Sequence, residues 1–172
     1  IGTSVTYREA GSNNSPVVVD LTGSKNASGE TTWFFDKPVP SSKKVVDELL
    51  SMSGTWYESK FGGATYTAIL DRSLNFFGVF QTTNEALLLM GTASETSATL
   101  TKTELKYDKP IELFRFPMSL GSKWTASGTA SGTLSGVPFV RMNETYVFEV
   151  DAKGKAKTLV GEFPVIRLKL NL

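Results

Sequence analysis

The chemistry open to this chain is limited by two residue types that it lacks. The 172-residue sequence contains no histidine and no cysteine. Thiol nucleophiles, disulfides, Cys/His zinc sites and Ser-His or Cys-His dyads are therefore excluded. Carboxylates, lysines and tyrosines remain as candidate general acids and bases.

These remaining groups form no arrangement that is typical of an enzyme. The one pair of adjacent carboxylates is Asp47–Glu48, which we expect to face solvent. A carboxylate pair of the glycosidase kind stays open, because sequence spacing does not determine the distance between two such groups. No Gly-x-Ser-x-Gly motif, phosphate-binding loop or EF-hand loop is present. We therefore expect a protein without catalytic residues, metal ligands or a cofactor.

Aromatic side chains make the strongest candidate ligand site. The candidate ligand-binding residues are Trp56, Tyr57, Tyr66, Phe76, Phe77 and Phe80. One interpretation is an aromatic-lined cavity for an acyl chain, or a platform that stacks on a sugar. The other is that these residues belong to the core and the sheet surface. The second interpretation is favoured, because large aromatic side chains are ordinary contributors to buried area.

Charge and hydropathy exclude other classes of partner. The chain has 18 basic and 17 acidic residues scattered along its length, a formal net charge of +1. No basic stripe is present, so we expect no nucleic-acid partner. The longest apolar run, Ala86–Met90, is too short to span a membrane. Abundant Ser, Thr, Gly and Asn favour an extracytoplasmic protein, and we expect a leader or upstream segment before Ile1.

The elements that must position these residues are mostly β-strands. Short apolar and alternating segments, separated by Gly- and Asn-rich turns, predict a single β domain over residues 1–172. We expect a strongly curved antiparallel sheet or half-open barrel, with one short helix near 42–51. Asp151–Gly154 is expected to form a tight turn between two strands. The alternation from Ile166 to Leu172 predicts a half-buried final strand.

A set of turn and aromatic residues marks the C-terminal third. The structural motif residues are Pro117, Gly121, Trp124, Gly161 and Phe163. Pro117 and Gly121 suit a turn, Trp124 suits the core, and Phe163 is expected to face inward.

The order of these residues resembles an exported bacterial lipoprotein-type β domain of uncharacterised family, loosely similar to the half-barrel of the LolA/LolB lipoprotein carriers. That resemblance implies a concave apolar face that holds acyl chains. The segment Gly54–Glu58 also resembles the Gly-x-Trp start of lipocalin- and streptavidin-type barrels. It implies a ligand-binding role for Trp56.

The sequence therefore predicts a non-catalytic bacterial protein in the periplasm, at the outer membrane or at the cell surface. The expected partner is a lipid or another apolar small molecule bound on a curved sheet. The alternative is a cell-surface structural, interaction or carbohydrate-binding module.

Overall fold

Strands dominate the fold. The computed structural model describes residues 2–9, 19–37 and 42–172. In these residues the single helical element is a 3-10 turn, η1 (Glu58–Lys60). The strands are β1 (Ser4–Glu9), β2 (Ser24–Lys25), β3 (Thr31–Phe35), β4 (Lys43–Glu48), β5 (Tyr66–Asp71), β6 (Phe76–Thr82), β7 (Ala86–Ser94), β8 (Glu104–Arg115), β9 (Lys123–Leu134), β10 (Val137–Thr158) and β11 (Gly161–Asn171). The mainly β fold expected from the sequence is confirmed.

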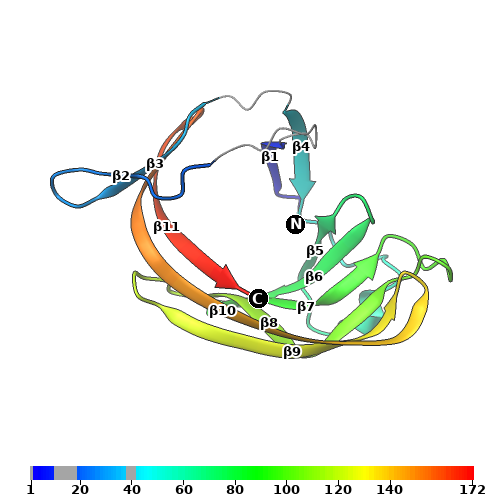
Figure 1. The fold of residues 1–172 in the computed structure, drawn as a ribbon. Helices are drawn as coiled ribbons and strands as arrows, with labels where there is room; N and C mark the ends of the chain where they lie inside the picture. Colours follow the sequence, from blue (N-terminus) through cyan, green and yellow to red (C-terminus); the bar gives the residue numbers. More distant parts are fainter. Residues whose placement is uncertain (1, 10–18, 38–41) are drawn as a thin grey trace.

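Most strands belong to one large sheet. Its strand order is β2-β3-β10-β9-β8-β7-β6-β5, with β11 on β10. All neighbours are antiparallel except β3 and β10, which run parallel. β1 and β4 form a separate two-stranded sheet, which is joined to β5 by a bridge between Leu50 and Thr67. Figure 1 shows the long β10 bending through the molecule, with β1 and β4 on the opposite side.

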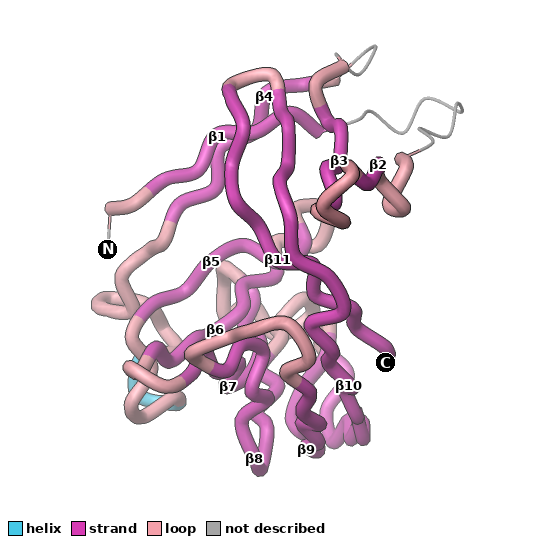
Figure 2. The backbone as a smooth tube through the Cα atoms, turned by 90° about the vertical axis from the view of Figure 1, so that its left-hand side faces the viewer, coloured by secondary structure: helices cyan, strands magenta, loops and turns pink. Residues whose placement is uncertain are grey.

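The 22-residue strand β10 holds the sheet together. Its first part pairs with β9, and its second part pairs with β11 on one side and β3 on the other. Figure 2 shows the β10–β11 hairpin extending past the other strands of the sheet, to the level of β1, β3 and β4. A register shift between Val150 and Ala152 marks a bulge where the strand changes partners. Bulges of this kind bend a strand and increase its twist.

The prediction of a turn at Asp151–Gly154 is wrong, because β10 continues through these residues. The chain reverses instead after Thr158, between β10 and β11. Gly154 allows two strands to approach closely and does not form a turn. A Cβ placed there would lie 2.0 Å from the carbonyl oxygen of Thr31. Only glycine allows β3 to come this near to β10.

The prediction of a short helix near 42–51 is also wrong. Residues 43–48 form β4, which pairs with β1 in the register Thr6↔Val46. Val45 is buried while Val46 is exposed, the period-2 pattern of a strand. Two adjacent β-branched residues favour a strand, and pairing with β1 outweighs the apolar spacing that suggested a helix.

The core lies on both faces of the sheet. The large cluster is centred on Phe80, Leu89, Leu105, Tyr107, Ile111, Trp124, Ala126, Ala130, Phe148 and Val150. The small cluster consists of Met52, Tyr57, Phe61, Val79 and Ala93. Adjacent residues of β6 divide between them, Phe80 in the large cluster and Val79 in the small one. The segment between β4 and β5, which includes η1, supplies three residues of the small cluster and so covers that face.

Candidate functional site

Four of the six aromatic candidates pack in or against the two clusters, two with each. Tyr57 belongs to the small cluster and Trp56 packs against it; the two rings meet edge to face, with centroids 5.4 Å apart. Trp56 Nε1 donates to the carbonyl oxygen of Ser94 at 3.0 Å, and the Lys102 ammonium lies 4.9 Å from the Trp56 ring centroid. These contacts pin the covering segment to β7.

Tyr66 and Phe80 lie in the large cluster, on the other face of the sheet. Their rings stack with centroids 5.1 Å apart, as cross-strand partners of β5 and β6. Phe76 and Phe77 are partly buried at the start of β6. None of the six residues lines any of the three concavities described below. Within the described residues, these three concavities therefore do not bring the six side chains together.

The C-terminal motif residues lie at turns and in the core. Gly121 has a φ of +87° in the turn before β9. Trp124 is buried, stacks on Phe148 at 4.8 Å, and donates from Nε1 to the Glu112 carbonyl at 2.9 Å. Pro117 lies in the connection between β8 and β9, and Gly161 begins β11. Phe163 differs from the inward orientation expected for it, since it is 46% exposed. Its cross-strand partner Ala156 lies on the face opposite the large cluster.

A concavity lies where β10 changes partners. The ladder with β9 ends at Glu149, and Val150 exchanges backbone hydrogen bonds with Gly121 and Ser122. The ladder with β3 begins only at Gly154. Between these points the side of β10 that faces away from β11 lies against a hollow of about 830 Å³, which we call the junction cleft.

The junction cleft combines an apolar wall with two lysines. Leu120, Pro164 and Ile166 contribute apolar side chains. Ile166 is the cross-strand partner of Lys153, so both side chains lie on the same face of the hairpin. Lys25 also lines the cleft. Within the described residues, neither Lys25 nor Lys153 forms an ion pair.

The acidic groups at the cleft are already engaged. Asp151 accepts two hydrogen bonds from Arg167, Nε to Oδ1 at 2.8 Å and Nη2 to Oδ2 at 3.0 Å. These bonds lower the pKa of the Asp151 carboxyl below its usual range. Glu30 lies 4.0 Å from Lys155, which also pairs with Glu162 at 3.2 Å. Asp151 is therefore paired with Arg167 and Glu30 with Lys155, so both carboxylates of the cleft already have cationic partners other than Lys25 and Lys153.

Arg167 joins the N-terminal strands to the C-terminal hairpin. Besides Asp151, its guanidinium hydrogen-bonds the carbonyl oxygen of Leu21 and lies 5.6 Å from the Trp33 ring centroid. Trp33 is buried and donates from Nε1 to the same Leu21 oxygen at 2.9 Å. A second hollow of about 440 Å³ lies beside this cluster and shares Lys25 and Asp151 with the junction cleft. The cluster holds one wall of the junction in place.

A polar triad that sequence reasoning missed lies within the large cluster. Tyr107 and Tyr146 both donate hydrogen bonds to Glu144 Oε2, the second over 2.6 Å. Burial raises the pKa of the Tyr107 phenol, and the bond to Glu144 raises it further. The sequence carries a signal for this triad. Glu144 is a charged residue at an alternating position that is otherwise occupied by Met142, Tyr146 and Phe148. The two phenols satisfy the carboxylate, so the triad stabilises a fold rather than presenting a free base.

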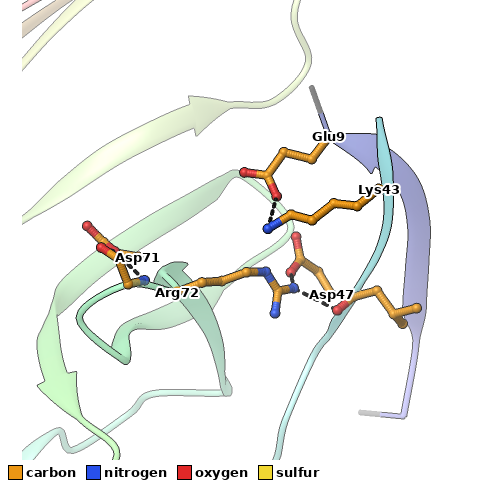
Figure 3. A network of polar contacts seen from close by, with 7 residues as sticks. Glu9, Lys43, Asp47, Asp71 and Arg72 are labelled. Atoms are coloured by element: carbon orange, nitrogen blue, oxygen red, sulfur yellow. Dashed lines mark hydrogen bonds and ion pairs between the residues drawn. The ribbon is translucent and has the colours of Figure 1, made fainter. Parts of the chain in front are cut away.

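The third concavity, of about 590 Å³, lies between β1, β4 and the β5–β6 turn and is strongly charged. Figure 3 shows Glu9 facing Lys43, and Arg72 reaching from the turn to Asp47. Arg72 also donates to the Val46 carbonyl at 2.7 Å. Asp71 accepts from Ser73 Oγ at 2.6 Å, which lowers the pKa of the Asp71 carboxyl. These groups pair with one another and tie the β1–β4 sheet to the large sheet.

Comparisons with known proteins identify no relative. The chain matches no protein-family model, no curated protein and no solved structure. Among the described residues, no group of three or more acidic side chains is placed to hold a metal ion. No described helix is long and apolar enough to cross a membrane. Any function is therefore inferred from the geometry of this chain.

Proposed function

We propose that the protein is a non-catalytic binding protein, and that its junction cleft takes a small amphiphile with an apolar body and an anionic head group. The observation that supports this is one hollow of about 830 Å³ that combines an apolar wall with two lysines, neither of which forms an ion pair within the described residues. Small-molecule sites have volumes of about 300–1,000 Å³, with mostly apolar walls and a few polar groups that orient the ligand.

The lysines at the cleft favour an anionic head group. Lys153 and Lys25 present ammonium groups, which recognise a carboxylate, sulfate or phosphate. Ile166 and Leu120 suit an alkyl chain. The apolar wall continues toward the core, since Leu168 follows on the same face of β11 and packs against the large cluster. We thus keep the apolar ligand expected from the sequence and propose it for a site away from Trp56–Phe80. The extracytoplasmic location stays a prediction.

The test is a binding measurement with matched amphiphiles. Decanoate and decyltrimethylammonium are titrated into detergent-free protein below their critical micelle concentrations, followed by isothermal calorimetry and native mass spectrometry. We expect decanoate to bind and the cation of equal chain length to bind at least tenfold more weakly. Binding of both compounds with equal affinity would contradict the anionic head group, and binding of neither would contradict the site.

Matched variants locate the site. Lys153→Gln removes one ammonium group and is expected to weaken decanoate binding about two- to fivefold, the usual contribution of a partly exposed charge pair. Lys157→Gln is the control, because Lys157 lies on the same face of β10 but pairs with Asp36 and does not line the cleft. An equal effect of both substitutions would place decanoate elsewhere.

A second candidate is an interaction module that uses the edge of the sheet. In the described residues β11 pairs only with β10, and Phe163, Ile166 and Leu170 on it are exposed. Such an edge can accept another strand. Light scattering across a concentration series tests for self-pairing, and Leu170→Lys is expected to abolish any dimer formed in this way.

A further inference from the structure

Two neighbouring turns at one end of the molecule present an apolar tip. One turn lies between β7 and β8, and the other between β9 and β10, both at the right-hand end of Figure 1. Gly136 donates its N–H to the Lys102 carbonyl at 2.8 Å, and Ser135 donates to Thr103 Oγ1 at 3.0 Å. These bonds hold the two turns together, so their exposed side chains form one surface.

Three large apolar side chains project from this tip. Phe139 is 96% exposed, Leu100 is 88% exposed and Val137 is 59% exposed. Phe139 has a φ of +61°, a conformation that a bulky residue rarely adopts. It lies in a bulge, since Val137 pairs with Leu134 while Val140 pairs with Gly132. The backbone is therefore strained at the residue whose aromatic ring is most exposed, which indicates a functional constraint on that ring.

The tip is also free of charge. Residues 96–101 and 124–140 contain no Asp, Glu, Lys or Arg, while hydroxylated residues are frequent in both. The nearest charged residues are Glu95, Lys102, Glu104 and Arg141, equal numbers of each sign. Lys102 and Glu104 pair with each other at 2.7 Å. An apolar and uncharged surface bordered by hydroxyl groups matches the interfacial region of a bilayer of neutral lipids.

We propose that the tip formed by Leu100, Val137 and Phe139 inserts into the surface of a zwitterionic lipid bilayer. Insertion requires that backbone groups entering the apolar layer already have partners. Around the tip, Gly136, Ser135 and Thr101 have their N–H groups bonded within the protein. Burial of Phe139 and Leu100 in lipid then supplies the attraction, which is hydrophobic rather than electrostatic.

This surface is separate from the junction cleft. The cleft lies along the β10–β11 hairpin near β3, whereas the tip lies at the β9–β10 turn at the other end of β10 (Figure 1). Membrane contact would therefore leave the cleft open to solvent. The inference does not depend on the ligand of the cleft, and each can fail without the other.

The test is flotation of the full chain with phosphatidylcholine vesicles. We expect the protein to float with the vesicles and to do so equally at low and high salt. Phe139→Gly is expected to weaken binding about tenfold, from the apolar area removed. Because glycine favours a positive φ, the same substitution is expected to leave the melting temperature unchanged or higher, so loss of binding cannot be attributed to unfolding.

The control is Val160→Ser. Val160 is 86% exposed and lies in the β10–β11 turn, at the opposite end of β10 from the tip. It removes a comparably exposed apolar side chain and should float like the unaltered protein. In addition, the tryptophan fluorescence of the Phe139→Trp variant should shift to the blue on adding vesicles. Brominated lipid should quench this fluorescence. Flotation that Phe139→Gly leaves intact overturns the proposal, as does flotation that salt abolishes. A lipid-free dimer that Phe139→Gly dissociates would assign the tip to a protein contact instead.

Discussion

At the scale of single residues, Glu144 is the side chain least expected where it lies. A carboxylate in a row of apolar residues is costly to bury unless it is hydrogen-bonded. Tyr107 and Tyr146 both donate to it, and Tyr107 is nearly fully buried. The carboxylate in turn favours the neutral form of both phenols, whose pKa values are raised, for each first by burial and then by the bond to Glu144.

The raised pKa values predict a loss of stability in alkali. A tyrosine of the unfolded chain titrates near pH 10, whereas Tyr107 keeps its proton to a higher pH when folded. The folded state therefore binds more protons, and the stability due to Tyr107 is full below about pH 10 and falls as the pH rises above it. Thermal unfolding between pH 8 and 11 measures this, and Tyr107→Phe should flatten the decline above pH 10. A decline of equal slope in the variant would contradict the assignment.

At the scale of elements, two local contacts hold separate strands in place. Gly154 is one, where the oxygen of Thr31 and the ring of Trp33 occupy the space that a side chain would need. The other is the β5–β6 turn, from which Arg72 reaches the β1–β4 sheet. Both are contacts between strands remote in sequence, one steric and one electrostatic.

Gly154→Ala is expected to destabilise the protein by about 2–3 kcal/mol, because backbone and not a flexible side chain meets the new methyl group. Urea unfolding measures the change. Gly62→Ala is the matched control, since a Cβ at Gly62 meets nothing within 4 Å, and its effect should be within about 0.5 kcal/mol of zero. A small effect at both positions would mean that β3 does not lie this close to β10.

Arg72→Gln is expected to loosen the β1–β4 sheet selectively. The substitution removes the ion pair to Asp47 and weakens the contact with the Val46 carbonyl. Amide hydrogen exchange should become faster in β4 and remain unchanged in β8 and β9. Lys123→Gln removes an exposed pair with Glu149 and should change neither region. Exchange that accelerates throughout the sheet would show that β1–β4 is not a separate unit.

At the scale of the whole molecule, Arg167 connects residues 19–35 to the C-terminal hairpin. It contacts Leu21 and Trp33 from the N-terminal segment and Asp151 from β10. Its planar guanidinium makes the paired bonds to Asp151 and the contact with the Trp33 ring at the same time, which a lysine cannot do.

Arg167→Lys is therefore expected to release residues 19–35 from the hairpin while leaving β5–β9 folded. Limited proteolysis should cut first in that segment, and tryptophan emission should shift to the red as Trp33 gains solvent. The cost in stability is expected to be about 1 kcal/mol. Arg141→Lys, on an exposed part of β10, is the control and should leave both readouts unchanged. Unchanged proteolysis of Arg167→Lys would contradict this role.

The sequence predicted what depends on local pattern. The alternation from Ile166 to Leu172 identified β11. The short apolar segments separated by turn residues identified the β class. The prediction for residues 43–48 was wrong because their apolar spacing fits a helix as well as a strand. Only pairing with β1 decides between the two. The junction cleft could not be predicted, because Lys25, Leu120 and Lys153 come from three separate segments. Its geometry follows from the point at which β10 changes partners, which no local pattern records.

The parallel pairing of β3 with β10 has a consequence for the order of folding. Thr31 meets Gly154, so this ladder closes only after nearly all of the intervening chain has been made and arranged. Local hairpins such as β5–β6 and β6–β7 close over short loops and form early, whereas contacts between distant segments form slowly. During synthesis the segment that contains Trp33 emerges before β10 and docks among the last. Until β10 is available, its apolar residues are exposed to whatever else is nearby, including chaperones and other nascent chains.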